Sequence, residues 1–216
     1  MPWFAIIMGM AYIVAGITHF LMPREQLHMA SGIKPVFFES LKSSSTVFRI
    51  HYWAIIIGTL AGAAVVIGIG PALGIQQGIM LMILRIGAVC GFLVTALSFG
   101  LMLKRAVHVS HIWPSLSEHT RETIHTNGLP NLDPFGLFGF GLVGVWLIAF
   151  NLAAINVGVL PVWHGLVGCA GGALYISVSA GMLFHITFLV DISAALGCIV
   201  VAPLWSIVLA LIFMKV

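Results

Sequence analysis

The chain has 216 residues, of which 61% are hydrophobic and only 7% charged, and its formal net charge is +3. An ordinary soluble domain has roughly 25% charged residues, and a soluble fold of this size could not bury so much apolar surface. The composition therefore excludes a soluble domain and predicts an integral membrane protein in contact with the lipid bilayer. Because the basic residues lie between the hydrophobic runs, they indicate membrane topology and no nucleic-acid partner.

The hydrophobic runs are as long as the roughly 20 residues of a transmembrane helix, and they do not alternate with a period of two. Since backbone polar groups must be satisfied inside the bilayer, the runs predict an all-α, polytopic bundle of about six transmembrane helices. We expect one integral membrane domain over residues 1–216, with helices at about 2–22, 49–69, 79–103, 134–156, 161–185 and 187–214. The polar segments 23–48 and 104–133 separate these helices.

Two short patterns predict helix starts in the second polar segment. Ser115 and Glu118 have the spacing of a capping box, and Asn127-Gly128 is a typical helix end, so we expect a short helix at 116–126. Asp133 followed by Pro134 predicts the N-terminus of the fourth membrane helix.

Other residues predict where membrane helices end or bend. We expect the second helix to stop at Gly70-Pro71 and the third to end on Lys104-Arg105. Pro203 lacks a backbone N–H, so it is expected to kink the sixth helix.

The basic residues predict the orientation of the bundle. Seven of the nine Lys and Arg lie in or beside the two polar segments: Arg24, Lys34, Lys42, Arg49, Lys104, Arg105 and Arg121. The positive-inside rule then places both segments in the cytoplasm and both chain termini outside, in a bacterial inner membrane. Lys215 is the one terminal residue that opposes this orientation.

Three pairs of glycines have the spacing that lets helix backbones approach closely: Gly58 and Gly62, Gly87 and Gly91, and Gly168 and Gly172. Two interpretations follow from this spacing. The glycines permit tight packing within one monomer, or they form a dimer interface.

Nine histidines in a chain with six acidic residues are an unusual feature. His19 ends the first predicted helix, His51 begins the second and His185 ends the fifth, so all three should lie at the cytoplasmic boundary. Asp191 belongs to the same layer. Imidazole ligates haem iron and transition metals, and a nearby carboxylate orients such ligands. These four residues are candidates for binding a haem or a transition metal.

A second group of candidate metal ligands lies in the polar segment 104–133: His108, His111, Glu118, Glu122 and His125. The last three fall on one face of the predicted loop helix, and Glu122 and His125 have the spacing of half of a carboxylate-bridged di-iron site. The competing interpretation is that interfacial histidines are incidental, because their amphipathic rings are tolerated there and a polar helix simply lies on the membrane.

A third group lies in the outer leaflet: Arg85, Asn151, Asn156 and His164. A charged residue within an apolar span is costly and is usually functional. Arg85 either binds an anionic or quinone-like head group, with the two asparagines and His164 nearby, or its side chain reaches to the outer interface.

Two stretches resemble known bacterial membrane proteins. The sequence from Ala15 to Pro23, AGITHFLMP, resembles the first-helix signature of DoxX-like proteins, some of which are linked to quinone-dependent sulfur oxidation. The usual DoxX-like domain has four helices, so the likeness covers the first helix only. The segments LPVWHG at 160–165 and APLW at 202–205 make the C-terminal half similar to uncharacterised six-helix bacterial inner-membrane proteins.

The leading hypothesis is a redox-associated or cofactor-binding membrane subunit that uses its cytoplasmic-side histidines, with quinone or other membrane subunits as partners. The alternative is a non-enzymatic membrane component or assembly subunit with incidental histidines. A membrane-embedded metal-dependent enzyme is the third hypothesis. The sequence contains no P-loop, no dinucleotide-binding glycine pattern and no HExxH motif, so it leaves open whether the protein is an enzyme.

Overall fold

A computed structural model describes residues 1–27, 35–75, 78–129 and 131–214, and Lys34 and Lys215 lie outside these ranges. The described chain is helical and contains no strand, which confirms the all-α prediction. Six segments are long and apolar enough to cross a membrane: Pro2–Leu21, Thr46–Ala72, Ile79–Ser115, Leu137–Asn156, Val162–Leu183 and Thr187–Phe213. The protein is an integral membrane protein with a six-helix bundle.

The six spans form a closed ring in chain order. The helices of the ring are α1 (Pro2–Leu21), α4 (Thr46–Ala72), α5 (Ile79–Ile112), α7 (Val143–Asn156), α8 (Val162–Leu183), α9 (Thr187–Leu196) and α10 (Ala202–Phe213). Each packs against the next, α9 and α10 belong to one span, and α10 closes the ring by packing against α1. This arrangement gives every span a face toward a common interior.

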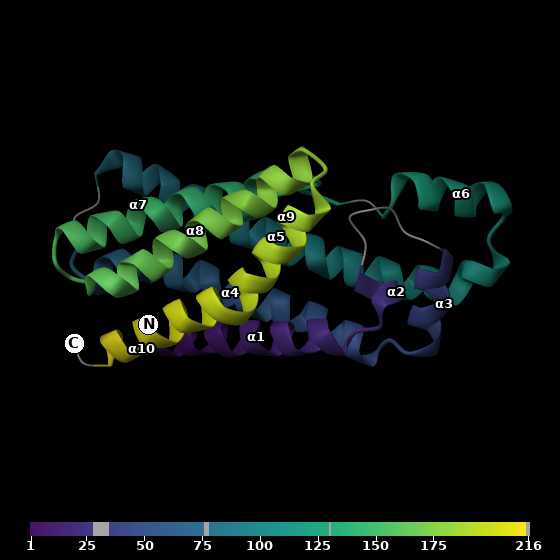
Figure 1. Ribbon diagram of the computed structural model, residues 1–216, viewed down its shortest axis with the longest axis horizontal. Coiled ribbons are helices and arrows are strands. Elements are labelled where there is room, and N and C mark those ends of the chain that lie inside the picture. Colours follow the sequence, from purple (N-terminus) through teal and green to yellow (C-terminus); the bar gives the residue numbers. More distant parts are fainter. Residues whose placement is uncertain (28–34, 76–77, 130, 215–216) are drawn as a thin grey trace.

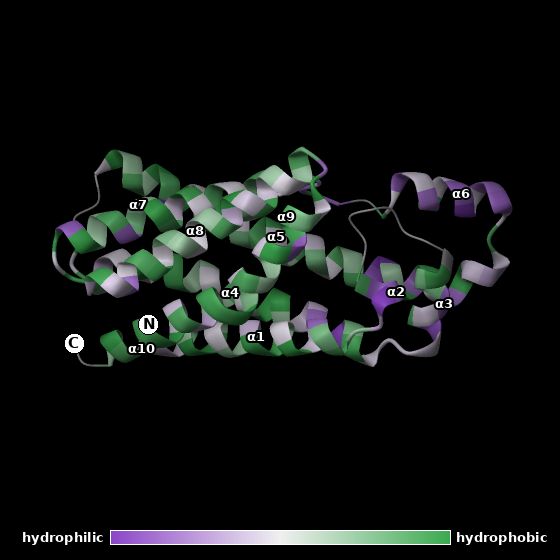
Figure 2. Ribbon diagram, in the orientation of Figure 1, coloured by the Kyte–Doolittle hydropathy of each residue, from purple (hydrophilic) through white to green (hydrophobic). Residues whose placement is uncertain are grey.

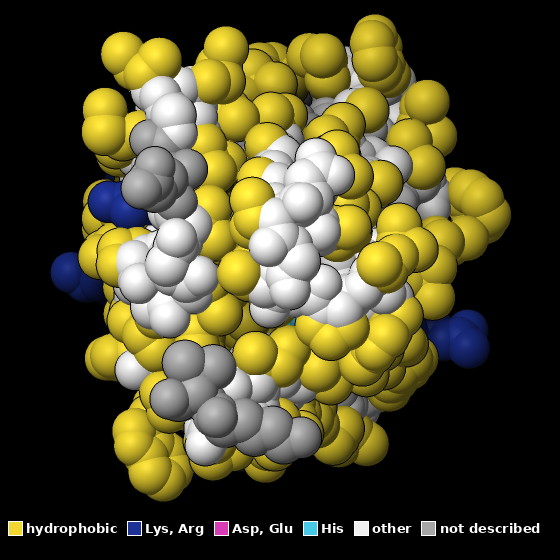
Figure 3. All heavy atoms as spheres, turned by 90° about the vertical axis from the view of Figure 1, so that its left-hand side faces the viewer, with side chains coloured by type: hydrophobic (Ala, Val, Ile, Leu, Met, Phe, Trp, Pro, Cys, Tyr) yellow, Lys and Arg dark blue, Asp and Glu magenta, His cyan; other side chains and the backbone are white. Residues whose placement is uncertain are grey.

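The polar helices gather at one end of the bundle (Figure 2). These are α2 (Arg24–Leu27), α3 (Pro35–Ser43) and α6 (Glu118–Asn127), which come from the two predicted polar segments. The chain termini lie at the opposite end (Figure 1), where hydrophobic side chains cover much of the surface (Figure 3). The two polar segments therefore lie on the same side of the bundle, and the termini lie on the other.

The third span is longer than the sequence suggests. Helix α5 does not end on Lys104-Arg105 but continues to Ile112, followed by a 3₁₀ turn at Trp113–Ser115. Its 34 residues extend about 50 Å at 1.5 Å per residue, well beyond the roughly 30 Å of hydrocarbon in a bilayer. The basic pair marks the edge of the hydrophobic run, whereas the α-helix continues to the 3₁₀ turn that contains Pro114, which has no backbone N–H to extend the α-helical hydrogen bonds.

We call the cap the assembly formed by α2, α3, α6 and the part of α5 after Lys104. The cap has a hydrophobic core of its own, which also includes Phe48 and Tyr52 at the start of α4. Phe37, Phe38 and Leu41 of α3 are almost completely buried. Phe38 stacks on Trp113 with 4.4 Å between ring centroids. The polar segments are thus a packed structure rather than loose connections.

The expected helix starts in the cap are only partly right. Ser117, not Ser115, precedes α6, and its Oγ accepts a hydrogen bond from the Thr120 backbone N–H at 3.3 Å. The predicted helix end is confirmed, since Gly128 follows Asn127 with φ of 70°.

The fourth membrane helix begins three residues later than predicted. The fourth span begins with a π turn at Leu137–Leu142, after Gly136 in the left-handed conformation. The Asp133 carboxylate accepts hydrogen bonds from the N–H groups of Phe138 and Gly139, at 3.1 and 2.8 Å. The predicted start at Asp133-Pro134 is therefore wrong, since Gly136 is the N-cap, but the Asp133 carboxylate still satisfies two N–H groups of the first turn.

Two proline predictions turn out differently. Helix α4 continues through Gly70 and Pro71 to Ala72, because a proline in the last turn removes only one hydrogen bond near a frayed end. In the sixth span a π turn at Gly197–Val201 precedes Pro203, which lies in the first turn of α10. The departure from α geometry therefore lies one turn earlier than Pro203.

The spaced glycines pack helices within this one chain. A Cβ on Gly172 would lie 2.6 Å from the Gly144 carbonyl oxygen, so α7 and α8 touch through their backbones. A Cβ on Gly62 would meet the Phe92 ring of α5, and one on Gly91 would meet the Phe138 carbonyl. These contacts support the interpretation that the glycines permit tight packing within the monomer.

Candidate functional site: a cavity inside the helix ring

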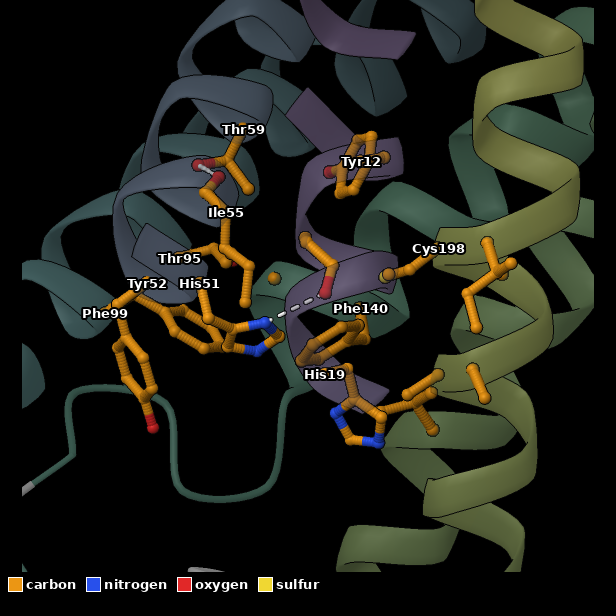
Figure 4. A pocket seen from close by; sticks show the side chains of 18 of the residues that line it. Tyr12, His19, His51, Tyr52, Ile55, Thr59, Thr95, Phe99, Phe140 and Cys198 are labelled. Atoms are coloured by element: carbon orange, nitrogen blue, oxygen red, sulfur yellow. Dashed lines mark hydrogen bonds between the residues drawn. The ribbon is translucent and has the colours of Figure 1, made fainter. Parts of the chain in front are cut away.

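A cavity of about 230 Å³ lies inside the ring (Figure 4). Every span contributes to its wall, as six of the lining residues illustrate: Tyr12 of α1, His51 of α4, Phe99 of α5, Phe140 of the π turn before α7, Tyr175 of α8 and Cys198 of the π turn after α9. The cavity runs toward the cap, where Met22, Gln26 and Leu27 also line it. A closed ring of helices thus holds a space that no single span could form.

Two of the predicted cofactor-binding histidines meet at this cavity. His19 near the end of α1 and His51 near the start of α4 lie on adjacent antiparallel helices, and their ring centroids are 5.8 Å apart. Both rings line the cavity, as Figure 4 shows. The sequence places them at similar depth because one ends a span and the other begins the next.

The hydrogen bonds of His51 define its tautomer. Its Nδ1 is 3.0 Å from the Ala15 carbonyl oxygen, which can only accept, so Nδ1 carries the proton. The Thr18 Oγ1, which donates to the Val14 carbonyl at 2.7 Å, lies 3.1 Å from the same nitrogen and can accept from it. In a neutral imidazole the other nitrogen, Nε2, is then an acceptor or a ligand atom.

Tyrosines form the deeper polar part of the cavity. The hydroxyl groups of Tyr12 and Tyr175 are 3.1 Å apart, although their helices α1 and α8 are separated in the ring by the last span. The chain has three tyrosines, and all of them line the cavity, Tyr52 being the third. Our sequence analysis missed this set, although buried Tyr hydroxyls usually find partners and three Tyr within apolar spans indicate an inward-facing polar layer.

His185 and Asp191 are not brought to His19 and His51. His185 lies between α8 and α9, exposed, with a positive φ of 56°. Asp191 is exposed on α9. Neither residue lines the cavity, so the structure joins two of the four predicted cofactor-binding residues there and leaves the other two at the surface.

The second predicted group is divided between two helices of the cap. His108 and His111 lie in the last turns of α5, whereas Glu118, Glu122 and His125 lie on α6, which has no buried residue. Within the described ranges, no three His, Cys, Asp or Glu side chains are grouped so that they could hold a metal ion. The structure gives the metal hypothesis no support at either site.

Part of the predicted outer polar cluster forms a buried network at the end near the termini. The Trp205 indole N–H of α10 donates to the Asn151 side-chain oxygen of α7 at 3.0 Å. The His164 Nε2–H of α8 donates to the Trp205 carbonyl at 2.9 Å, and the two rings stack at 6.1 Å. Asn151 and His164 are fully buried. The network connects three spans, and Trp205 is the member that our sequence analysis missed.

The other two members of that cluster are less buried than Asn151 and His164. Asn156 is exposed at the last residue of α7, and Arg85 is half-buried on α5. The Asn151 amide N–H₂ donates to the Leu147 carbonyl of its own helix at 2.8 Å, and its oxygen is taken by Trp205. Asn151 therefore stabilises the packing of α7 against α10.

The cavity has room for a small aromatic ligand. A cavity of roughly 150 Å³ holds benzene, and this one of about 230 Å³ is larger by about half. It accommodates one substituted six-membered ring.

A comparison of the chain with protein-family models, with curated proteins and with solved structures found no match. The functional argument therefore depends on the geometry of the cavity.

Proposed function

We propose that this integral membrane protein binds the head group of a quinone-class molecule in the cavity inside its helix ring, as a redox-associated membrane subunit. The observation that carries the proposal is the cavity itself, which has the volume of a single substituted ring and is lined by every span. Ligand sites between the helices of bundles are typically apolar with a few polar groups that orient the ligand.

The wall of the cavity matches a ring with oxygen atoms on opposite sides. Phe92, Phe99 and Phe140 provide apolar and aromatic surface. His19 and His51 lie toward the cap, and the Tyr12–Tyr175 pair lies deeper in the bundle. A quinone-class ring between these groups can place one oxygen near the histidines and the other near the tyrosines.

Two further features belong to this proposal. We also propose that the cap faces the cytoplasm of a bacterial cell, with the chain in the inner membrane and both termini outside, and the basic residues in and beside the two polar segments support this orientation. The likeness of residues 15–23 to the first helix of DoxX-like proteins, some of which are linked to quinone-dependent chemistry, agrees with a quinone-class ligand. That stretch contains His19 and Ala15, which both line the cavity.

Binding of single-ring probes to the detergent-purified protein tests the proposal. We expect trimethylbenzoquinone or trimethylhydroquinone, titrated anaerobically in a calorimeter, to bind at one site per chain. The Val178→Phe substitution enlarges a buried side chain of the cavity wall, so it should reduce the binding of both probes.

Val162→Phe provides the matched control, because it makes the same change on the same helix at a position that is 60% exposed. This variant should bind as the unmodified protein does. If neither probe binds to the folded protein, or if both variants bind equally well, the proposal is wrong.

A further inference from the structure

The sixth span packs against α1 over only part of its length. At the end near the termini α10 lies along α1, where a Cβ on Gly9 would be 2.7 Å from the Ser206 Oγ. Further along α1, a Cβ on Gly16 would be 2.7 Å from a side-chain carbon of Ile199, in the π turn before α10. Beyond this contact α9 does not pack along α1, although the structure describes every residue of both helices. Figure 1 shows the sixth span moving away from α1 between α10 and α9.

The π turn explains why one span both follows α1 and leaves it. Gly197–Val201 lies between α9 and α10 within the sixth span. The backbone hydrogen bonds of a π turn reach five residues instead of four, and helices bend where such turns interrupt them. Turns of this kind are frequent at functional sites.

The side on which the two helices diverge is also a side of the cavity. Here α1 contributes Gly16 and His19 to the wall, and α9 contributes Ser193, Ala194 and Ala195. We call these five residues the α1–α9 seam. The three side chains from α9 are small, so no large side chain of α9 fills the space between the helices at this seam.

The outer side of the seam faces the bilayer. Both helices belong to segments that can cross a membrane. Ile17 and Phe20 of α1 are 54% and 73% exposed, and Leu196 of α9 is 48% exposed. Because lipid tails are as apolar as these side chains, a molecule that enters the cavity here comes from lipid rather than from water.

We infer that the ligand enters the cavity from the bilayer through the α1–α9 seam, and that it has a hydrocarbon tail which lies in this seam while its ring lies in the cavity. This inference rests on the proposed function and names the ligand class as a membrane-soluble quinone with a tail. The cavity has the volume of one substituted ring, so a tail must leave it through the wall. The seam offers a way out between two helices that do not pack together.

A second apolar hollow on the outer surface offers a rival path for the tail. It lies between the π turn Leu137–Leu142 and α8, and Ala180 is one of its residues. Aromatic rings close the wall between this hollow and the cavity, because Phe140 of the turn packs on Tyr175 of α8 with 5.6 Å between ring centroids. The packing of the helices therefore favours the α1–α9 seam.

A photoreactive tail tests the inference. The probe is a dimethylbenzoquinone with a decyl tail that ends in a diazirine, added to the protein in nanodiscs of phosphatidylethanolamine and phosphatidylglycerol. After irradiation, peptide mass spectrometry identifies the residues that the tail touches. We expect crosslinks in residues 17–21 of α1 and 188–196 of α9 that excess trimethylbenzoquinone abolishes, because the untailed ring competes for the cavity.

Two matched variants narrow the two possible paths. Ala195→Trp places an indole in the α1–α9 seam, so it should reduce these competable crosslinks by about tenfold or more. Ala180→Trp makes the same change in the outer hollow and should leave them unchanged. If Ala195→Trp does not fold, the positions of the crosslinks in the unmodified protein still decide the question.

The outcomes separate this inference from the proposed function. Competable crosslinks in residues 137–142 and 176–184 would show that the tail leaves through the outer hollow, which overturns the inference but keeps a quinone-class site. The absence of competable crosslinks, in a protein that binds trimethylbenzoquinone, would show that no tail lies in the seam. If trimethylbenzoquinone itself does not bind, the proposed function is wrong.

Discussion

At the scale of single residues, Trp205 is the side chain whose polar contacts hold the terminal end of the ring together. Replacing Trp205 with Phe removes the indole N–H and leaves the buried Asn151 oxygen without its donor. Hydrogen bonds between membrane helices contribute on average about 0.6 kcal/mol and at most about 1.7 kcal/mol. We expect Trp205→Phe to lower stability by about 1 kcal/mol in a thermal unfolding experiment in detergent.

Trp163→Phe is the control for that experiment. Trp163 precedes His164 on α8 but is 53% exposed, so the same chemical change there should leave the unfolding temperature nearly unchanged. A loss of similar size in both variants would show that the network with Asn151 contributes nothing specific.

The residues of the site differ in how well a sequence reveals them. His19 and His51 could be predicted, because each lies where a hydrophobic run meets a polar segment, and such ends on consecutive helices come to the same depth. Tyr12 and Tyr175 could not be paired, since they are 163 positions apart and meet only when the ring closes. Gln26 was hidden in a polar segment with no periodic pattern, where only the packing of the cap distinguishes a buried amide from an exposed one.

At the scale of helices, the crossing of α7 and α8 depends on two glycines that face each other. In Gly172→Ala the new methyl group would lie 2.6 Å from the Gly144 carbonyl oxygen, a backbone atom that cannot move without separating the helices. We expect a loss of about 1–3 kcal/mol in the free energy of unfolding, measured by denaturant titration in mixed micelles.

Gly100→Ala should instead raise the free energy of unfolding. The added methyl group on α5 meets only a side-chain atom of Ile56 at 3.9 Å, and alanine in a helix is more favourable than glycine by about 0.5–1 kcal/mol. If both substitutions change stability in the same direction, helix propensity or detergent effects explain the results better than the backbone contact does.

The cap provides a third test at this scale. Phe38→Ala removes the ring that stacks on Trp113 and creates a cavity in the core of the cap, with an expected cost of about 3–5 kcal/mol. We expect faster amide hydrogen exchange in α3 and in the end of α5, whereas α7 and α8 remain protected.

Val36→Ala serves as its control, because Val36 lies on the same helix but is 47% exposed. Uniformly faster exchange through the whole bundle in Phe38→Ala would contradict a separate core in the cap.

The helices show which boundaries a sequence can predict. The centres of the six spans follow directly from hydrophobicity, because a bilayer of fixed thickness demands runs of a certain length. The ends do not, since Lys104 and Arg105 end the apolar run of α5 without ending the helix. The sequence does not reveal the cap as a folded unit, because its core combines residues from both polar segments. The hydrophobic pattern within each segment alone is too short to indicate a fold.

At the scale of the whole molecule, the proposed cytoplasmic position of the cap predicts which sites an impermeant reagent can reach. In a variant with Cys90, Cys169 and Cys198 replaced by Ala, we expect cysteines at Ser44 and Ser117 to react with an impermeant maleimide only after the cells are permeabilised. A cysteine at Val157, which is 60% exposed between α7 and α8 at the other end of the bundle, should react in intact cells.

Labelling of the Ser44 or Ser117 position in intact cells would show that the orientation is the opposite of the one we expect. Labelling of one of them but not of the other would contradict the structure as well, because both positions belong to the cap end of the bundle.

The ring order of the spans has a consequence for synthesis at the ribosome. The spans enter the membrane in the order in which they pack, so each finds its neighbour already in place, and the core shared by α3 and α5 forms once the third span has been made. The last wall of the cavity comes from α9 and the π turn at Gly197–Val201, and α10 then closes the ring against α1. A nascent chain that stops after α8 leaves the cavity open on the side of the missing span, so the cavity is completed in a single step with the final span.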